Sequence, residues 1–316
     1  MTLFRRLAYA TLTLAFAQIV FGAIVRITGS GMGCGDHWPT CAGQWFPPHD
    51  RIDLIIEITH RYIAAALTLA ILGLLLTTVV KRREPGVAGA GGVMRPAILA
   101  AGLVVTAAVF GAVTVKMGLN PYVIVTHLSI AMALLAVLVV MAVRAGGFGG
   151  GSAKMLAVGN TAISTSPKTY RAARGGVVLA FLTIVLGALT ANVAGANSSC
   201  QGFPTCRVVL VHGVPLAIQI THRVLAFLLL FHTFGMAMAA RKRVGPSALI
   251  RAAWIVFGTV LLQIFVAAML VELHLPPVWR SIHQATGTLV WLAIFTFAIL
   301  ARYATQGGAA LRSSST

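Results

Sequence analysis

The sequence predicts an all-α membrane protein of eight transmembrane helices, arranged as two four-helix bundles that are parallel repeats of each other. Hydrophobic residues make up 58% of its 316 residues and charged residues only 9%, whereas charged residues are about a quarter of a soluble protein. A pentapeptide also occurs twice, as EITHR at 57–61 and QITHR at 219–223, each time leading into a long apolar run. The composition therefore predicts a membrane protein, and the repeated pentapeptide predicts that it consists of two similar halves.

Eight apolar segments are each close to the ~20 residues that a helix needs to cross a bilayer. They lie at about 7–26, 54–80, 96–116, 122–143, 175–195, 216–240, 252–271 and 279–301. The first imitates a cleavable signal peptide, because two arginines precede an apolar run that contains Ala15-Phe16-Ala17. We expect it to stay as a span, because the run continues to Val25 and has a counterpart in the second half.

The basic residues predict the orientation. Of the 24 Lys and Arg residues, 17 fall in the termini and in the connections on the same side: Arg5, Arg6, Lys81, Arg82, Arg83, Arg95, Arg144, Lys154, Lys168, Arg171, Arg174, Arg241, Lys242, Arg243, Arg251, Arg302 and Arg312. The positive-inside rule then puts both termini in the cytoplasm of a cell-membrane protein. The loops at 27–53, 117–121, 196–215 and 272–278 face outward. Because the charge of +18 sits at helix ends, it does not indicate a nucleic-acid partner.

The internal repeat extends beyond the pentapeptide. Residues 16–23 match 181–188 at five of eight positions, and WPTC at 38–41 matches FPTC at 203–206. Each half has four spans, so both copies enter the membrane in the same direction. The predicted domains are a first half at 1–143, a Gly/Ser-rich cytoplasmic linker at 144–174, a second half at 175–302 and a disordered tail at 303–316.

Four histidines lie near the outer ends of the even-numbered spans, at matched places in the repeat: His60, His127, His222 and His283. An ionisable residue inside a span costs roughly 2.5 to 3.5 kcal/mol and tends to face the bundle interior with a partner. Two histidines from different helices can supply both axial nitrogens of a haem iron. We therefore expect one haem site in each half. The alternative is that each histidine only bonds a backbone carbonyl; zinc, which prefers about four clustered ligands, is disfavoured.

The other histidines are expected to face solvent or to pack. They are His37, His49, His212, His232 and His274.

The pentapeptides differ at their first residue. Glu57 lies one turn from His60 on the same helix face, where a carboxylate can accept a proton or orient water. The alternative is a simple ion pair with Arg61. Gln219 cannot accept the proton, which suggests that the first half does chemistry and the second holds a cofactor. Arg61 and Arg223 are candidate partners for haem propionates, or else interfacial anchors.

The four cysteines lie in two outward loops, as the pairs Cys34 with Cys41 and Cys200 with Cys206. Thiols outside the cytoplasm tend to oxidise, so two disulfides within the loops are expected. They are either structural clamps or redox-active groups that exchange with a thiol carrier.

The stretch GAIVRITGSGM at 22–32, the first cysteine pair around Trp38-Pro39 and the first pentapeptide closely resemble the haem A synthases, specifically the bacterial type with cysteine pairs in both large outer loops. The resemblance extends from Leu7 to about Arg302. It implies an enzyme that oxidises the C8 methyl group of haem O to a formyl group, giving haem A for haem-copper terminal oxidases.

The resemblance also implies roles for the candidate residues. His60 and His127 would belong to the substrate half, His222 and His283 would ligate a haem b cofactor, and Glu57 would take part in catalysis. The implied partners are the farnesyl transferase that makes haem O, haem-copper oxidase assembly and the lipid bilayer, with an electron donor that the sequence does not identify.

Two other functions fit part of the pattern. A dihaem b-type membrane cytochrome carrying electrons from quinol would also need four histidines, but not an acid beside one site alone. A transporter is disfavoured by the parallel repeat and by spans without obvious Pro or Gly breaks near the midplane.

Overall fold

The structure, a computed structural model, describes residues 1–35, 37–41, 43–46, 50–89, 91–148, 165–242 and 247–313. Within these residues, eight helices are long and apolar enough to cross a membrane, as the sequence predicts. Their bounds are α1 (Thr2–Ile27), α2 (Ile52–Val80), α3 (Met94–Lys116), α4 (Pro121–Arg144), α6 (Pro167–Asn192), α7 (Val214–Lys242), α8 (Ser247–Glu272) and α9 (Pro277–Ser313).

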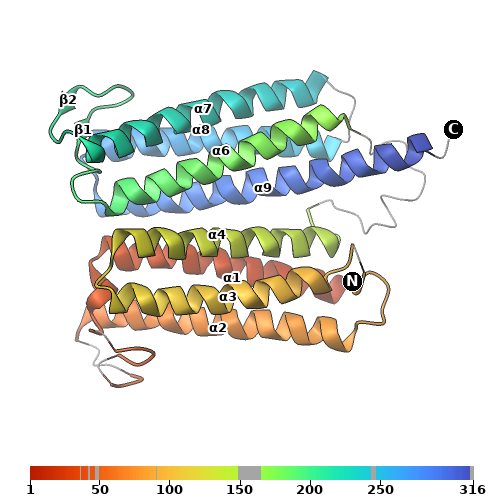
Figure 1. Cartoon of the computed structure of the whole chain (residues 1–316), viewed down its shortest axis with the longest axis horizontal. Coiled ribbons are helices and arrows are strands. Elements are labelled where there is room, and N and C mark those ends of the chain that lie inside the picture. Colours follow the sequence, from red (N-terminus) through yellow and green to blue (C-terminus); the bar gives the residue numbers. More distant parts are fainter. Residues whose placement is uncertain are drawn as a thin grey trace.

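The helices form two four-helix bundles that lie side by side (Figure 1). In the first, α1 packs on α2 and α4, and α3 packs on α2 and α4. In the second, α6 and α8 each pack on both α7 and α9. The bundles meet where α1 and α4 contact α9 and where α4 contacts α6. Each predicted half is thus a bundle with its own interior.

Local sequence fixes several helix starts. α4, α6 and α9 each begin with proline, whose missing N–H and fixed φ suit the first helical position. The side chain of Asn120 accepts a hydrogen bond from the Tyr122 N–H at 3.0 Å, and that of Ser166 accepts one from the Lys168 N–H at 3.3 Å. These caps satisfy N–H groups that lack helical partners.

Two helices extend beyond the predicted bounds. α6 begins at Pro167, inside the stretch assigned to the linker, because the Ser166 cap and Pro167 start the helix there. α9 runs to Ser313, so the part of the expected tail at 303–313 is helical. Extending a helix by one residue costs much less free energy than starting a new helix, and the alanines near the end of α9 have high helix propensity. The linker at 149–164 and the tail at 314–316 lie outside the described residues.

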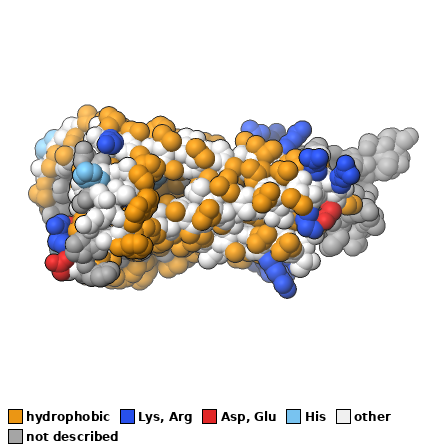
Figure 2. Space-filling model, turned by 90° about the horizontal axis from the view of Figure 1, so that it is seen from below, with side chains coloured by type: hydrophobic (Ala, Val, Ile, Leu, Met, Phe, Trp, Pro, Cys, Tyr) orange, Lys and Arg blue, Asp and Glu red, His pale blue; other side chains and the backbone are white. Residues whose placement is uncertain are grey.

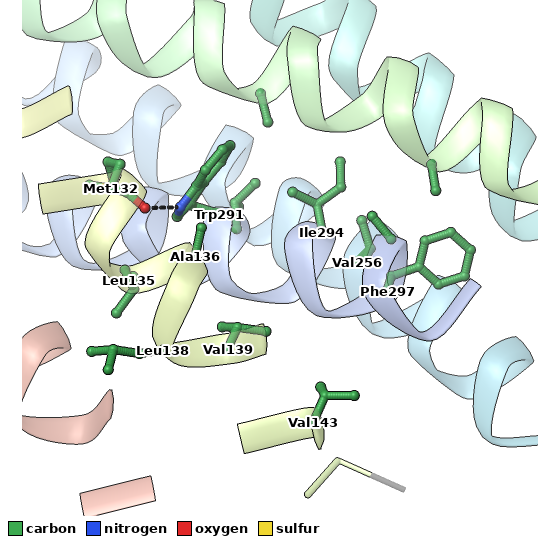
Figure 3. Close-up of a cluster of buried hydrophobic side chains, with 14 of the residues drawn as sticks. Met132, Leu135, Ala136, Leu138, Val139, Val143, Val256, Trp291, Ile294 and Phe297 are labelled. Atoms are coloured by element: carbon green, nitrogen blue, oxygen red, sulfur yellow. Dashed lines mark hydrogen bonds between the residues drawn. The ribbon is translucent and has the colours of Figure 1, made fainter. Parts of the chain in front are cut away.

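The largest buried cluster joins the two bundles. Leu135, Leu138 and Val139 of α4 are fully buried on the first-bundle side, as are Ile294 and Phe297 of α9 on the other (Figure 3). The indole N–H of Trp291 in α9 donates to the Met132 carbonyl of α4 at 2.9 Å. Helices in lipid associate through close packing and such hydrogen bonds. This seam holds the two bundles at a fixed register.

The loops between α1 and α2 and between α6 and α7 lie at one end of the molecule, which we call the loop end (Figure 1). They contain a short 3-10 helix, η1 (Ser30–Met32), and the paired strands β1 (Cys200–Gln201) and β2 (Val208–Val209). Both termini lie toward the other end. On the face in Figure 2, hydrophobic side chains cover the middle, and most Lys and Arg side chains gather toward the end with the termini.

Candidate functional site

Two disulfides close the long loops at the loop end. Cys34 bonds to Cys41 between α1 and α2, and Cys200 bonds to Cys206 between α6 and α7. Both pairings are those expected from the sequence. Each loop is then fastened to the first turns of the helix that carries the pentapeptide, α2 or α7.

Glu57 is buried, with 4% of its surface exposed. One carboxylate oxygen, Oε2, accepts the Cys34 N–H at 2.8 Å, and the other pairs with the Arg61 guanidinium. A buried carboxylate needs partners of this kind to remain charged. The acid of the first pentapeptide is therefore held in place by an arginine and a loop N–H, one helical turn from His60.

The arginines of both pentapeptides bind loop carbonyls. Arg61 Nη1 donates to the carbonyls of His37 and Thr40, each at 2.7 Å. Arg223 donates to the carbonyls of Gly202 at 2.7 Å and Cys200 at 2.9 Å. The two arginines, which are candidate propionate partners or interfacial anchors, thus bind the disulfide loops in this structure.

Gln219 occupies the place of Glu57 in the second bundle, with 5% of its surface exposed. Its Nε2 donates to the carbonyls of Asn197 at 3.2 Å and Cys200 at 3.3 Å. Its Oε1 is buried and has no hydrogen-bond partner in the described part of the chain. Glu57 accepts a hydrogen bond from a loop N–H, whereas Gln219 donates hydrogen bonds to loop carbonyls. The two positions therefore differ in hydrogen-bond direction as well as in charge.

His60 of α2 and His127 of α4 lie inside the first bundle, near enough for their charges to interact. A glycine lies beside each ring. A Cβ added to Gly22 of α1 would lie 3.0 Å from His60 Nε2, and one added to Gly111 of α3 would lie 3.4 Å from His127 Cε1. His127 Nδ1 is buried without a partner among the described residues. The first bundle therefore holds two neighbouring imidazoles that come from different helices.

His222 of α7 and His283 of α9 form the corresponding pair in the second bundle. The Thr183 carbonyl lies 3.0 Å from His222 Nδ1. Because a carbonyl only accepts, Nδ1 carries the proton and Nε2 keeps a lone pair for a metal. The Gln263 amide lies 3.1 Å from His283 Nδ1. Gly187, the repeat equivalent of Gly22, lies against His222, where a Cβ would be 2.8 Å from Cε1.

A cavity of about 210 Å³ opens between these two histidines. Its walls are mostly aliphatic side chains and small residues of α6, α7, α8 and α9, and Leu128 and Met132 of α4 close one side. The apolar walls suit the faces of a porphyrin, and Nε2 of His222 suits its iron. The donor set and the walls of this cavity fit a haem.

The remaining histidines do not join either pair. His232 Nε2 binds the Ala172 carbonyl at 2.9 Å, far along α7 toward the other end, which is the packing role expected for it. His212 and His274 lie in loops at the loop end, and His49 lies outside the described residues. Within the described ranges, no three His, Cys, Asp or Glu side chains gather into a metal site. The candidate metal donors thus come as imidazole pairs.

Several polar residues that line the second cavity were not candidates from the sequence, among them Arg26, Thr183, Gln263 and Arg280. Gln263 and Arg280 carried a weak signal, because each is a polar residue in or beside a predicted apolar span. Thr183 contacts His222 through its backbone carbonyl, and every residue type has such a carbonyl, so the sequence does not single it out. Arg26 belongs to the first half, and only the packing of the two bundles brings it to the second cavity.

A family model and several known proteins match most of this chain. The family model COX15-CtaA, described as cytochrome oxidase assembly protein, matches residues 5–295. The chain is 25% identical to the heme A synthase of Geobacillus kaustophilus over 252 residues, which are 78% of this chain and 74% of that protein. It is 26% identical to the heme A synthase of Exiguobacterium sibiricum over 226 residues, 72% of this chain and 71% of that one.

A shorter similarity concerns a differently named protein. Over 57 residues, or 18% of this chain, the sequence is 49% identical to the protoheme IX farnesyltransferase of Thermus thermophilus. The match covers 9% of that protein.

Proposed function

Because the chain belongs to the COX15-CtaA family of cytochrome oxidase assembly proteins, we propose that it is a haem A synthase, a multi-pass membrane oxidoreductase that converts haem O to haem A. Relatives named heme A synthase, matched over most of their length, support this enzyme over a dihaem cytochrome. The observation that carries the proposal is one imidazole pair in each bundle, with the buried acid Glu57 beside the first and, among the described residues, the buried amide Gln219 at the matched place in the second.

We assign the second bundle to the cofactor, haem b. His222 and His283 would bind its iron, and the Thr183 carbonyl would keep His222 in the tautomer whose Nε2 is free. When bound, haem b supplies a one-electron redox centre. The protein contributes an aliphatic cavity that excludes water and fixes both ligands on different helices.

We assign the first bundle to the substrate, haem O. His60 and His127 would bind its iron, and Glu57 would accept a proton as the methyl group is oxidised. Arg61 and the Cys34 N–H hold Glu57 in place. Gln219 has no such capacity in the second bundle, which fits a half that binds its haem without altering it.

The membrane orientation and the partners of the enzyme are proposed from the distribution of basic residues and from the similarity to known proteins. The excess of Lys and Arg at the end with the termini supports a cell-membrane protein with both termini in the cytoplasm. The disulfide loops then face outward, where disulfides persist. The similarity to a protein named protoheme IX farnesyltransferase supports a functional link with the enzyme that supplies haem O. The product would go to haem-copper oxidase assembly.

Expression in two strains tests this function. With a farnesyl transferase that supplies haem O, chromatography of the extracted pigments is expected to show haem A together with haem b. Without it, the purified chain should still carry haem b alone, because the cofactor site does not depend on the substrate. Accumulation of haem O without haem A in the first strain would contradict the proposal.

A further inference from the structure

The cavity of the second bundle carries unbalanced positive charge. Arg26, Arg223 and Arg280 line it, and no aspartate or glutamate is among its described lining residues. Arg223 already donates to two loop carbonyls. Arg223 keeps its charge, but its guanidinium is held at the loop by two hydrogen bonds, so Arg26 and Arg280 have more N–H donors left for a ligand.

Arg26 reaches this cavity from the other bundle. It lies in the last turn of α1, is half-buried, and donates through Nη1 to the Ala191 carbonyl of α6 at 3.2 Å. That carbonyl places the guanidinium at the boundary between the bundles, at the loop end. An arginine has five N–H donors, so the others stay free for a second acceptor.

Arg280 lies in the first turn of α9 and lines the same cavity as Arg26. It is half-buried, and in the described part of the structure its side chain has no hydrogen bond or ion pair. The two guanidiniums are close enough for their charges to repel. Two like charges in a half-buried place are unfavourable unless an anion joins them.

We propose that Arg26 and Arg280 form an anion clamp, built by both bundles, that binds the carboxylates of the haem held by His222 and His283. The inference rests on the proposed cofactor site. Guanidinium groups bind carboxylates through paired, charge-assisted hydrogen bonds. The clamp lies at the loop end of a cavity with aliphatic walls, so the ligand's charged edge and apolar ring each meet a matching surface.

The clamp also makes the first bundle part of the cofactor site. Arg26 of α1 binds the carboxylate edge, and Leu128 and Met132 of α4 wall the cavity. The haem of the second bundle thus lies against the bundle that binds the substrate, and both are fixed by the α4–α9 seam. Loading of the cofactor then depends on correct packing of the two bundles.

A comparison of two ligands tests the clamp. The apoprotein of the full chain is titrated with iron protoporphyrin IX and with its dimethyl ester, which lacks the two carboxylates. The wild-type chain is expected to bind the acid roughly 10- to 100-fold more tightly, the range for hydrogen bonds to charged groups. In Arg26→Gln with Arg280→Gln, this ratio should fall toward one while affinity for the ester is kept.

Arg171→Gln is the matched control, because it removes one exposed charge of α6 far from the cavity and should keep the wild-type ratio. Arg280→Gln alone guards against misfolding of the double variant, since Arg280 has no partner to lose among the described residues, and it should lower the ratio by itself. An unchanged ratio in Arg280→Gln and in the double variant would overturn the clamp. If His222→Ala leaves both titrations unchanged, the proposed haem site itself is wrong.

Discussion

His222→Ala and His283→Ala are each expected to abolish the low-spin haem b spectrum of the purified protein. The two side chains reach one cavity from α7 and α9, so each would supply one axial nitrogen. Low-spin iron needs both, and no other His, Cys, Asp or Glu is grouped with them in the described chain to replace either. Reduced-minus-oxidised absorption spectra and the haem-to-protein ratio measure the effect.

His232→Ala is the control for these variants. The His232 side chain lies on the same helix as His222 but binds the Ala172 carbonyl, away from the loop end. Its removal should therefore leave the haem spectrum unchanged. A normal low-spin spectrum in either His222→Ala or His283→Ala would show that the second bundle is not the cofactor site.

Glu57→Gln is expected to keep haem b bound and to lower haem A formation by about 10²- to 10⁴-fold, the usual contribution of a positioned acid or base. The substitution is nearly isosteric, and its remaining carbonyl oxygen can still accept the Cys34 N–H. The amide can neither take the proton nor form the ion pair with Arg61. Haem A and haem O in extracts are quantified by chromatography, with haem b as the internal reference.

The control for Glu57→Gln must separate catalysis from loop anchoring. Asp53→Asn removes another acid of α2 that is ion-paired outside the site, with Arg51, and should leave haem A formation normal. The rate at which a reductant opens the Cys34–Cys41 disulfide reports on the loop. Normal haem A formation in Glu57→Gln would remove Glu57 from the mechanism, and faster reduction with loss of activity would assign it to the loop instead.

Much of the fold follows from segment length and repeat. Eight apolar runs near the length of a bilayer crossing became eight helices within the described residues. The matched histidines came together as His60 with His127 and His222 with His283, because equal positions in equal spans lie at equal depth. Gly22 and Gly187 also match in the repeat, and each lies against the histidine of its pentapeptide.

Other features needed three-dimensional packing. Spans that are apolar all round give no periodicity that tells which face meets the other bundle, so Arg26 could not be assigned to the second cavity from the sequence. Arg61 and Arg223 were candidate propionate partners or interfacial anchors, and their hydrogen bonds to the loop carbonyls could not be assigned from the sequence. The extension of α9 beyond 302 reflects helix propagation, which an apolar pattern does not record.

In the proposed division of roles, the second bundle holds a haem and the first bundle alters one. The most direct test of this division is chromatography of the pigments retained by two double variants, each produced with a source of haem O. His60→Ala with His127→Ala is expected to retain haem b and to lack haem O and haem A. His222→Ala with His283→Ala is expected to lack haem b and to retain haem O. Loss of the same pigment from both variants would contradict the division of roles between the bundles.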